Sequence, residues 1–155
     1  MINKFENTIN SLTRLINALN DSSNYYYRLL NLNLDYADII KPLYNQKVDF
    51  LNKMLKEYKR LTKKEFPQDY SLANYIITYN NIDLLEECLR TEKKLIDLYS
   101  DIMNKDVLWE ILPVLAHHNN YLKASKGLLL SYIDDYKRHN KSIIVDYSRH
   151  ASLVN

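Results

Sequence analysis

The sequence predicts an all-α protein, an antiparallel four-helix bundle made of two helical hairpins joined by a longer link. Three observations lead to this fold class. Apolar residues recur at alternating spacings of three and four along four long segments, which is the period of one helical face. No long segment alternates apolar and polar residues as a half-buried strand does. The 155 residues include one glycine and three prolines, too few for a fold with many tight turns.

The first hairpin is expected from helices at residues 8–33 and 39–63, because the short connection between them favours antiparallel neighbours. Asn7 and Asp38 stand where an N-cap is needed. Each helix carries one apolar face with a polar member in it. The two faces are Ile9, Leu12, Ile16, Leu19, Ser23, Tyr26 and Leu30, and Ile40, Tyr44, Lys47, Leu51, Met54, Tyr58 and Leu61.

The second hairpin is expected from helices at residues 82–103 and 106–138. Pro113 falls inside the last of these helices and predicts a kink that leaves the carbonyl of Trp109 without its usual partner. The faces again contain polar members. The two faces are Ile82, Leu85, Leu89, Glu92, Ile96, Tyr99 and Met103, and Leu108, Ile111, Leu115, His118, Leu122, Ser125, Leu129 and Tyr132.

The chain is therefore divided into a bundle at residues 1–140 and a C-terminal tail at residues 141–155. The link at residues 64–80 contains a small apolar patch, Leu72 to Ile77, and is long enough either to cross the bundle or to cap one end. In the tail, the run Ile143 to Val145 is apolar enough to dock on another surface.

Charge and cysteine content exclude several classes of protein. The formal net charge is +2, and both signs are mixed along the chain, so a dedicated nucleic-acid binder is not expected. Cys88 is the only cysteine, which excludes an intrachain disulfide and favours a reducing, cytoplasmic setting. Residues 1–20 lack the apolar core of a signal peptide, and the most apolar stretch, Val107 to Ala116, is too short to cross a membrane.

Two segments carry a resemblance to a known group of proteins. LTRLINALNDSSNYYYRLL (Leu12 to Leu30) and LLEECLRTEKKLIDLYSDIM (Leu84 to Met103) resemble a bacterial family of ferritin-like four-helix bundles whose function is unknown. The similarity covers Ile9 to Tyr136 and implies a ferritin-like bundle, with no activity attached to it.

Catalytic ferritin-like proteins bind two irons through glutamates and two Glu-x-x-His motifs. This chain lacks those motifs, because no acidic residue stands three positions before any histidine. The residues found there, before His117, His118, His139 and His150, are Val114, Leu115, Tyr136 and Tyr147. Iron oxidation is therefore not expected from the fold.

Glu92 and His118 occupy face positions that apolar residues normally fill. Glu92 lies 11 residues before Met103 and His118 lies 11 after Val107, so a short hairpin would place them at one level. A buried Glu must be paired or neutralised, and a structural Glu–His hydrogen bond is the expected outcome. The alternatives are a two-ligand site for iron, manganese or zinc, completed by Tyr26 or water, and a slipped register that exposes both residues.

Two further polar features have structural interpretations. Lys47 is expected to extend to the edge of the bundle with its charge in water. A basic stripe, defined here as the cations between Lys53 and Lys64, ends the second helix, where cations are favoured. It is expected to be a solvated face, with binding of an anionic partner or nucleic acid as the weaker alternative.

These observations predict a non-enzymatic bundle without a cofactor, which acts by forming a homodimer or by binding another protein. The runner-up is a divergent metal-binding bundle that uses Glu92 and His118. No membrane association is expected. Four leucines are expected to be fully buried near the middle of the bundle, and they are Leu19, Leu51, Leu89 and Leu115.

Overall fold

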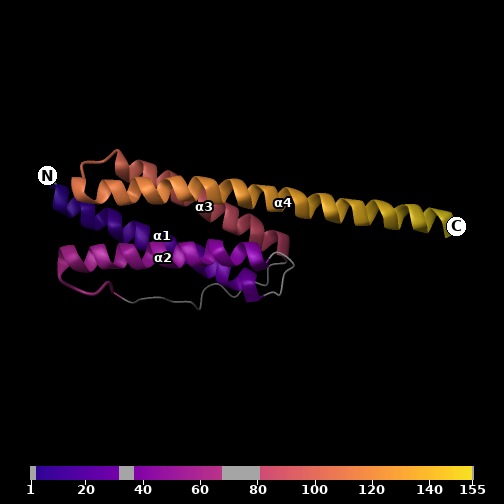
Figure 1. The fold of residues 1–155 in the computed structure, drawn as a ribbon, viewed down its shortest axis with the longest axis horizontal. Helices are drawn as coiled ribbons and strands as arrows, with labels where there is room; N and C mark the ends of the chain where they lie inside the picture. The colour runs from indigo at the N-terminus through magenta and orange to yellow at the C-terminus, as the bar shows by residue number, and fades with distance from the viewer. Residues whose placement is uncertain (1–2, 32–36, 68–80, 155) are drawn as a thin grey trace.

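The predicted all-α, four-helix class is confirmed. A computed structural model of the chain contains four long helices, and no strand occurs among the residues that it describes (Figure 1). The described residues are 3–31, 37–67 and 81–154. The helices are α1 (Lys4–Asn31), α2 (Ala37–Thr62), α3 (Asn81–Met103) and α4 (Leu112–Val154).

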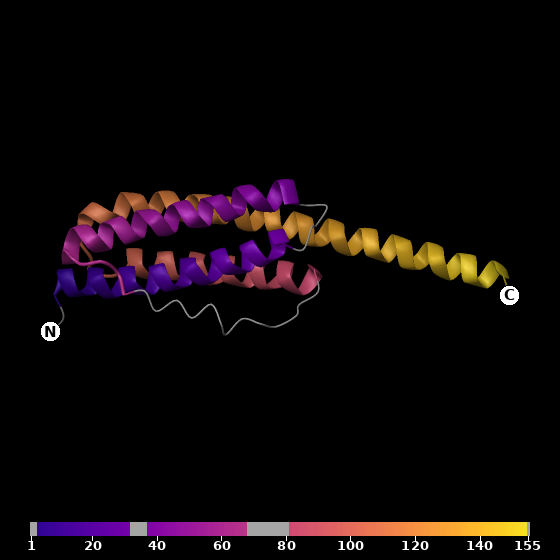
Figure 2. The same cartoon turned by 90° about the horizontal axis from the view of Figure 1, so that it is seen from below.

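Neighbouring helices in the bundle run in opposite directions. Figures 1 and 2 show α1 antiparallel to α2, and α3 antiparallel to α4, whereas α2 and α3 run the same way. Helix α2 ends at one end of the bundle, and α3 begins at the other. The apolar patch predicted at Leu72 to Ile77 lies outside the described residues.

The start of the fourth helix differs from the prediction. A short 3₁₀ turn, η2 (Trp109–Ile111), precedes α4, which begins at Leu112 rather than at residue 106. Pro113 is therefore in the first turn of α4, where a missing amide hydrogen costs little. The Trp109 carbonyl lacks the usual amide of residue 113, as predicted, but it accepts a hydrogen bond from the backbone N–H of Leu112 instead.

The end of the fourth helix also lies beyond its predicted boundary at residue 138. Helix α4 has 43 residues, against 28, 26 and 23 in α1, α2 and α3. Its C-terminal part extends past the ends of the other three helices in both views (Figures 1 and 2). The backbone at residues 141–154, assigned from sequence to a tail, continues this helix.

Side chains of all four helices fill two apolar clusters, one toward each end of the bundle. The larger cluster lies toward the N-terminal end of α1 and the smaller toward its C-terminal end. The first contains Leu12, Leu15, Ile16, Leu19, Phe50, Met54, Leu95, Tyr99, Ile102, Val107, Ile111, Leu115 and Leu122. The second contains Tyr25, Tyr26, Leu29, Ile40, Leu43, Leu84, Leu85, Cys88, Leu129 and Ile133.

Leu19 and Leu115 are fully buried as predicted, but Leu51 and Leu89 are only partly buried. The buried faces of α2 and α3 are turned by a fraction of a helical turn from the predicted faces. The described core positions of α3, for example, are Leu84, Leu85, Cys88, Thr91, Glu92, Leu95, Tyr99 and Ile102. Leu89 lies beside this face rather than in it.

Candidate functional site

A layer of polar side chains separates the two apolar clusters. Every helix contributes to this layer at the point along its length where one cluster ends and the other begins. A buried polar group is costly unless it is hydrogen-bonded, so the layer is the part of the core whose chemistry needs an explanation. The polar layer consists of Ser22, Ser23, Gln46, Lys47, Thr91, Glu92 and Ser125, and all but Gln46 are buried.

The centre of the polar layer is an ion pair between α2 and α3. Lys47 Nζ lies 2.6 Å from Glu92 Oε1, and both side chains have 0% exposure. The hydroxyl of Tyr26 donates a hydrogen bond of 2.8 Å to the same carboxylate oxygen. The prediction that Lys47 extends into water is wrong, because its ammonium finds a carboxylate inside the bundle instead.

Burial and charge act together on the groups around this pair. Desolvation lowers the pKa of Lys47, and the carboxylate of Glu92 works in the opposite direction. Desolvation and then the Glu92 charge raise the pKa of Tyr26. The same two causes raise the pKa of the buried Cys88 thiol, which therefore remains protonated and unreactive.

Gln46 connects the ion pair to α4. Its side-chain oxygen accepts a hydrogen bond of 2.8 Å from Lys47 Nζ and lies 2.8 Å from the hydroxyl of Ser125. That hydroxyl is also 2.9 Å from the carbonyl of Tyr121, so its one proton is shared between two acceptors. The polar layer therefore ties α2, α3 and α4 together at one level, and Tyr26 adds α1.

His118 contacts members of the larger apolar cluster and has its own partners there. Its Nδ1 lies 2.9 Å from the hydroxyl of Tyr99, and its ring stacks on Phe50 with 3.7 Å between ring centroids. Burial is the main cause that lowers the pKa of His118 to about 4, followed by the charge of Lys53. His118 is therefore a neutral, buried imidazole at neutral pH.

The structure assigns Glu92 and His118 to different contacts, so the predicted Glu–His hydrogen bond is not formed. Glu92 pairs with Lys47, whereas His118 pairs with Tyr99, two helical turns further along α3. The residue of α4 at the level of the ion pair is Ser125. This shift of about two turns follows from the late start of α4, which the sequence placed six residues earlier.

Each of the two residues in the metal-site hypothesis has one polar side-chain atom without a hydrogen-bond partner among the described residues. Glu92 Oε2 and His118 Nε2 are buried and have no hydrogen-bond partner within the described part of the chain. The Lys47 ammonium, however, already supplies a cation to the Glu92 carboxylate and would repel a metal ion there. No group of three or more metal-ligating side chains is found among the described residues.

The depressed pKa of His118 predicts a specific dependence of stability on pH. The unfolded chain binds a proton at His118 near its ordinary pKa of 6.5, whereas the folded protein binds it only near 4. Stability should therefore fall as the pH drops below about 6.5 and should stop falling from this cause below about 4. In His118→Gln this part of the pH dependence should disappear from urea unfolding curves.

The exposed neighbour His117 provides the matched control for that experiment. His117→Gln should keep the loss of stability between pH 6.5 and 4 that His118 causes. If both variants show the wild-type pH profile, a buried neutral His118 is the wrong explanation of the acid sensitivity.

Half of the cations in the basic stripe on α2 are paired with carboxylates. Lys53 lies 3.1 Å from Asp49, and Arg60 lies 2.7 Å from Glu57 and 3.4 Å from Glu110. All these contacts are on the surface, where such pairs contribute little to stability. The stripe therefore has less free positive charge for an anionic partner than its sequence indicates.

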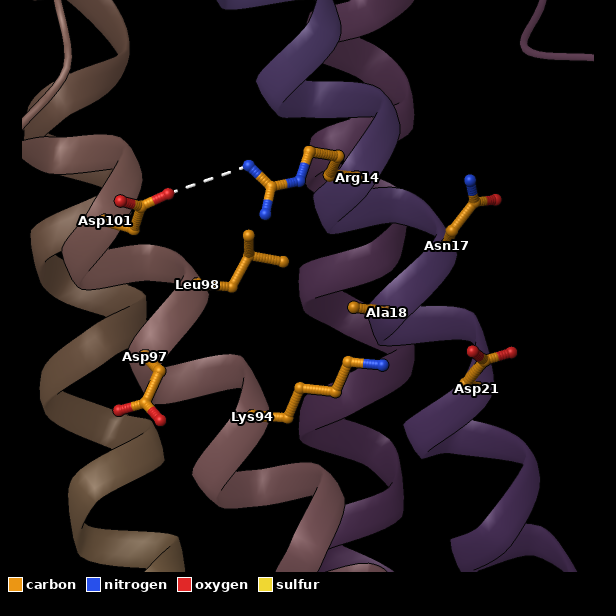
Figure 3. A pocket seen from close by; sticks show the side chains of 8 residues that line it. All are labelled: Arg14, Asn17, Ala18, Asp21, Lys94, Asp97, Leu98 and Asp101. Carbon is orange, nitrogen blue, oxygen red and sulfur yellow. Dashed lines mark ion pairs between the residues drawn. The ribbon is translucent and has the colours of Figure 1, made fainter.

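A surface groove outside the polar layer lies between α1 and α3 (Figure 3). It has a volume of about 510 Å³, and Figure 3 shows Arg14 directed at Asp101, 3.6 Å away. None of its lining side chains is fully buried, and charges of both signs surround a small apolar floor. The lining residues are Arg14, Asn17, Ala18, Asp21, Lys94, Asp97, Leu98 and Asp101.

Comparison of the chain with models of known protein families, with curated proteins and with solved structures finds no match. Within the described ranges, no helix combines the length and the apolar composition that are needed to cross a membrane.

Proposed function

We infer that this protein is a non-enzymatic helical bundle that acts by associating with another protein surface, in the first place with a second copy of itself, through the extended helix α4. The observation that carries this inference is the length of α4, whose C-terminal part extends beyond the other helices (Figure 1). A helix of about 15 residues is only marginally stable alone in water. Packing on a partner would stabilise this extension.

The sequence of the extension supports an apolar contact. The extension contains the apolar run Ile143 to Val145. An apolar run that lies beyond the rest of the bundle is suited to a second helical surface. The polar layer supports a structural role for the interior, since its charged groups are fully buried and paired with one another.

The same proposal includes the type of bundle and the cellular compartment of the protein. One long connection between α2 and α3, with antiparallel neighbours on either side, is the connectivity of ferritin-like bundles and favours that assignment. A single buried cysteine, Cys88, is in keeping with a reducing cytoplasm.

Truncation after Asn140 tests the function. The intact chain should sediment as a dimer at about 50 µM, a concentration above the dissociation constant of a modest interface. The truncated chain should sediment as a monomer and should lose only the helical signal of the removed residues. Lys56→Ala, an exposed change on α2, serves as the control and should remain dimeric. An intact chain that is monomeric at this concentration would contradict self-association.

The metal-binding alternative is supported by the unpartnered Glu92 Oε2 and His118 Nε2. It is opposed by the Lys47 ammonium, so we place it second. Elemental analysis of purified protein distinguishes the two functions. Stoichiometric iron, manganese or zinc that is absent from Glu92→Gln would favour the metal-binding alternative.

A further inference from the structure

The outward face of α4 carries two opposite charges close to the point where the helix leaves the bundle. Asp135 and Arg138 are both exposed and are three residues apart, so they lie on the same side of the helix. Neither residue takes part in the ion pairs between described residues, unlike Lys137, which contacts Glu86 of α3 at 3.2 Å. Their charges are therefore available to an external partner.

The same stripe continues toward the N-terminus of α4 with small and apolar residues. Leu128 is 49% exposed, and Ala124 and Ser131 are exposed one turn to either side of it. Beside them, Gly127 has no neighbouring heavy atom within 4 Å of the position that a Cβ would occupy. A second helix could therefore approach this part of α4 closely.

We propose that this outer stripe of α4 is the interface with a second copy of the chain, in which the two α4 helices pack antiparallel about a two-fold axis between residues 136 and 137. The proposal rests on the self-association proposed above. In a two-fold interface, if residue i contacts residue j, then j contacts i. Asp135 of each copy therefore lies beside Arg138 of the other, which gives two ion pairs.

The charge pattern selects this partner and this direction. A parallel arrangement would place Asp135 beside Asp135 and Arg138 beside Arg138, and like charges across an interface are strongly unfavourable. In the antiparallel register, Leu128 and Ser131 lie beside positions 145 and 142 of the second copy, within the extension that truncation removes. The net charge of +2 is low enough that two copies repel each other only weakly.

Charge reversal tests the interface directly. Asp135→Lys and Arg138→Asp each place like charges at both contacts, and each variant alone should dimerise about a hundredfold more weakly than the wild type. An equal mixture of the two variants restores opposite charges at both contacts. Sedimentation should therefore show monomers for each variant and a heterodimer for the mixture. Asp97→Lys reverses an exposed aspartate on α3 and is the control that should remain dimeric.

The outcomes separate this interface from self-association itself. If the wild type and both variants are equally dimeric, the α4 interface is overturned while self-association stands. If both variants are monomeric and their mixture remains so, the antiparallel register is overturned. A monomeric wild type would overturn both proposals. Circular dichroism should show that every variant keeps the helix content of the bundle, because the substituted side chains are exposed, and that the monomeric variants lose at most the signal of the α4 extension.

Discussion

Removal of either partner of the buried ion pair should lower the free energy of unfolding by about 3–5 kcal/mol, measured by urea denaturation of Lys47→Ala and Glu92→Leu. Each substitution leaves the other charge inside the bundle without its counter-ion, at a place where both side chains have 0% exposure. In Glu92→Leu the hydroxyl of Tyr26 also loses its acceptor. Breaking one side of the pair therefore costs far more than the net contribution of the pair itself.

The double substitution Lys47→Met with Glu92→Leu separates these two quantities. It removes both charges and replaces them with apolar groups of similar volume, so the double variant should be within about 1 kcal/mol of the wild type or more stable. The exposed pair of Lys53 and Asp49 is the control, and Lys53→Ala there should cost at most about 1 kcal/mol. If the single variants at the buried pair are no worse than this control, Lys47 and Glu92 are not buried together.

The polar layer could be recognised in part from the sequence. Each predicted apolar face contained a polar member, and Ser23, Lys47, Glu92 and Ser125 all lie in the layer. What periodicity could not supply was the pairing between faces, because the level at which two helices meet depends on where each one begins. Prediction of α4 from residue 106 placed His118 opposite Glu92, whereas the start at Leu112 places Ser125 there.

The connection before α4 explains why its start was misplaced. Residues 104–108 fold back toward α1: the side chain of Asn7 donates to the carbonyl of Asp106, and the N–H of Leu108 donates to Thr8. These bonds satisfy the backbone polar groups that a longer helix would otherwise have satisfied. They depend on contacts between residues about 100 positions apart, which a local pattern does not reveal.

The ion pair also bears on how α4 is held. A charged group in the core favours the one arrangement in which its counter-ion is present, so a buried polar layer can select a register even where it adds little stability. Here the Gln46 and Ser125 contact fixes α4 against α2 at the level of Lys47. We therefore expect the double apolar variant to keep its stability but to position α4 less uniquely, which is visible as broadened amide resonances of α4.

Substitutions in the apolar clusters should cause the other large loss of stability. Leu19→Ala and Leu115→Ala should each lower the free energy of unfolding by about 2–5 kcal/mol, because both side chains have 0% exposure and their removal leaves a cavity in the larger cluster. Leu51→Ala and Leu89→Ala should cost less, since these side chains lie at the edges of their clusters and water already reaches them.

Leu128→Ala is the matched control, because Leu128 has the same chemistry at 49% exposure. Its variant should lose less than about 1 kcal/mol when unfolding is measured on the monomer, where no interface contributes. The order expected from urea unfolding is therefore a large loss at Leu19 and Leu115, an intermediate loss at Leu51 and Leu89, and the smallest at Leu128. Equal losses at Leu19 and Leu89 would mean that α3 presents the face predicted from its sequence rather than the rotated face of the structure.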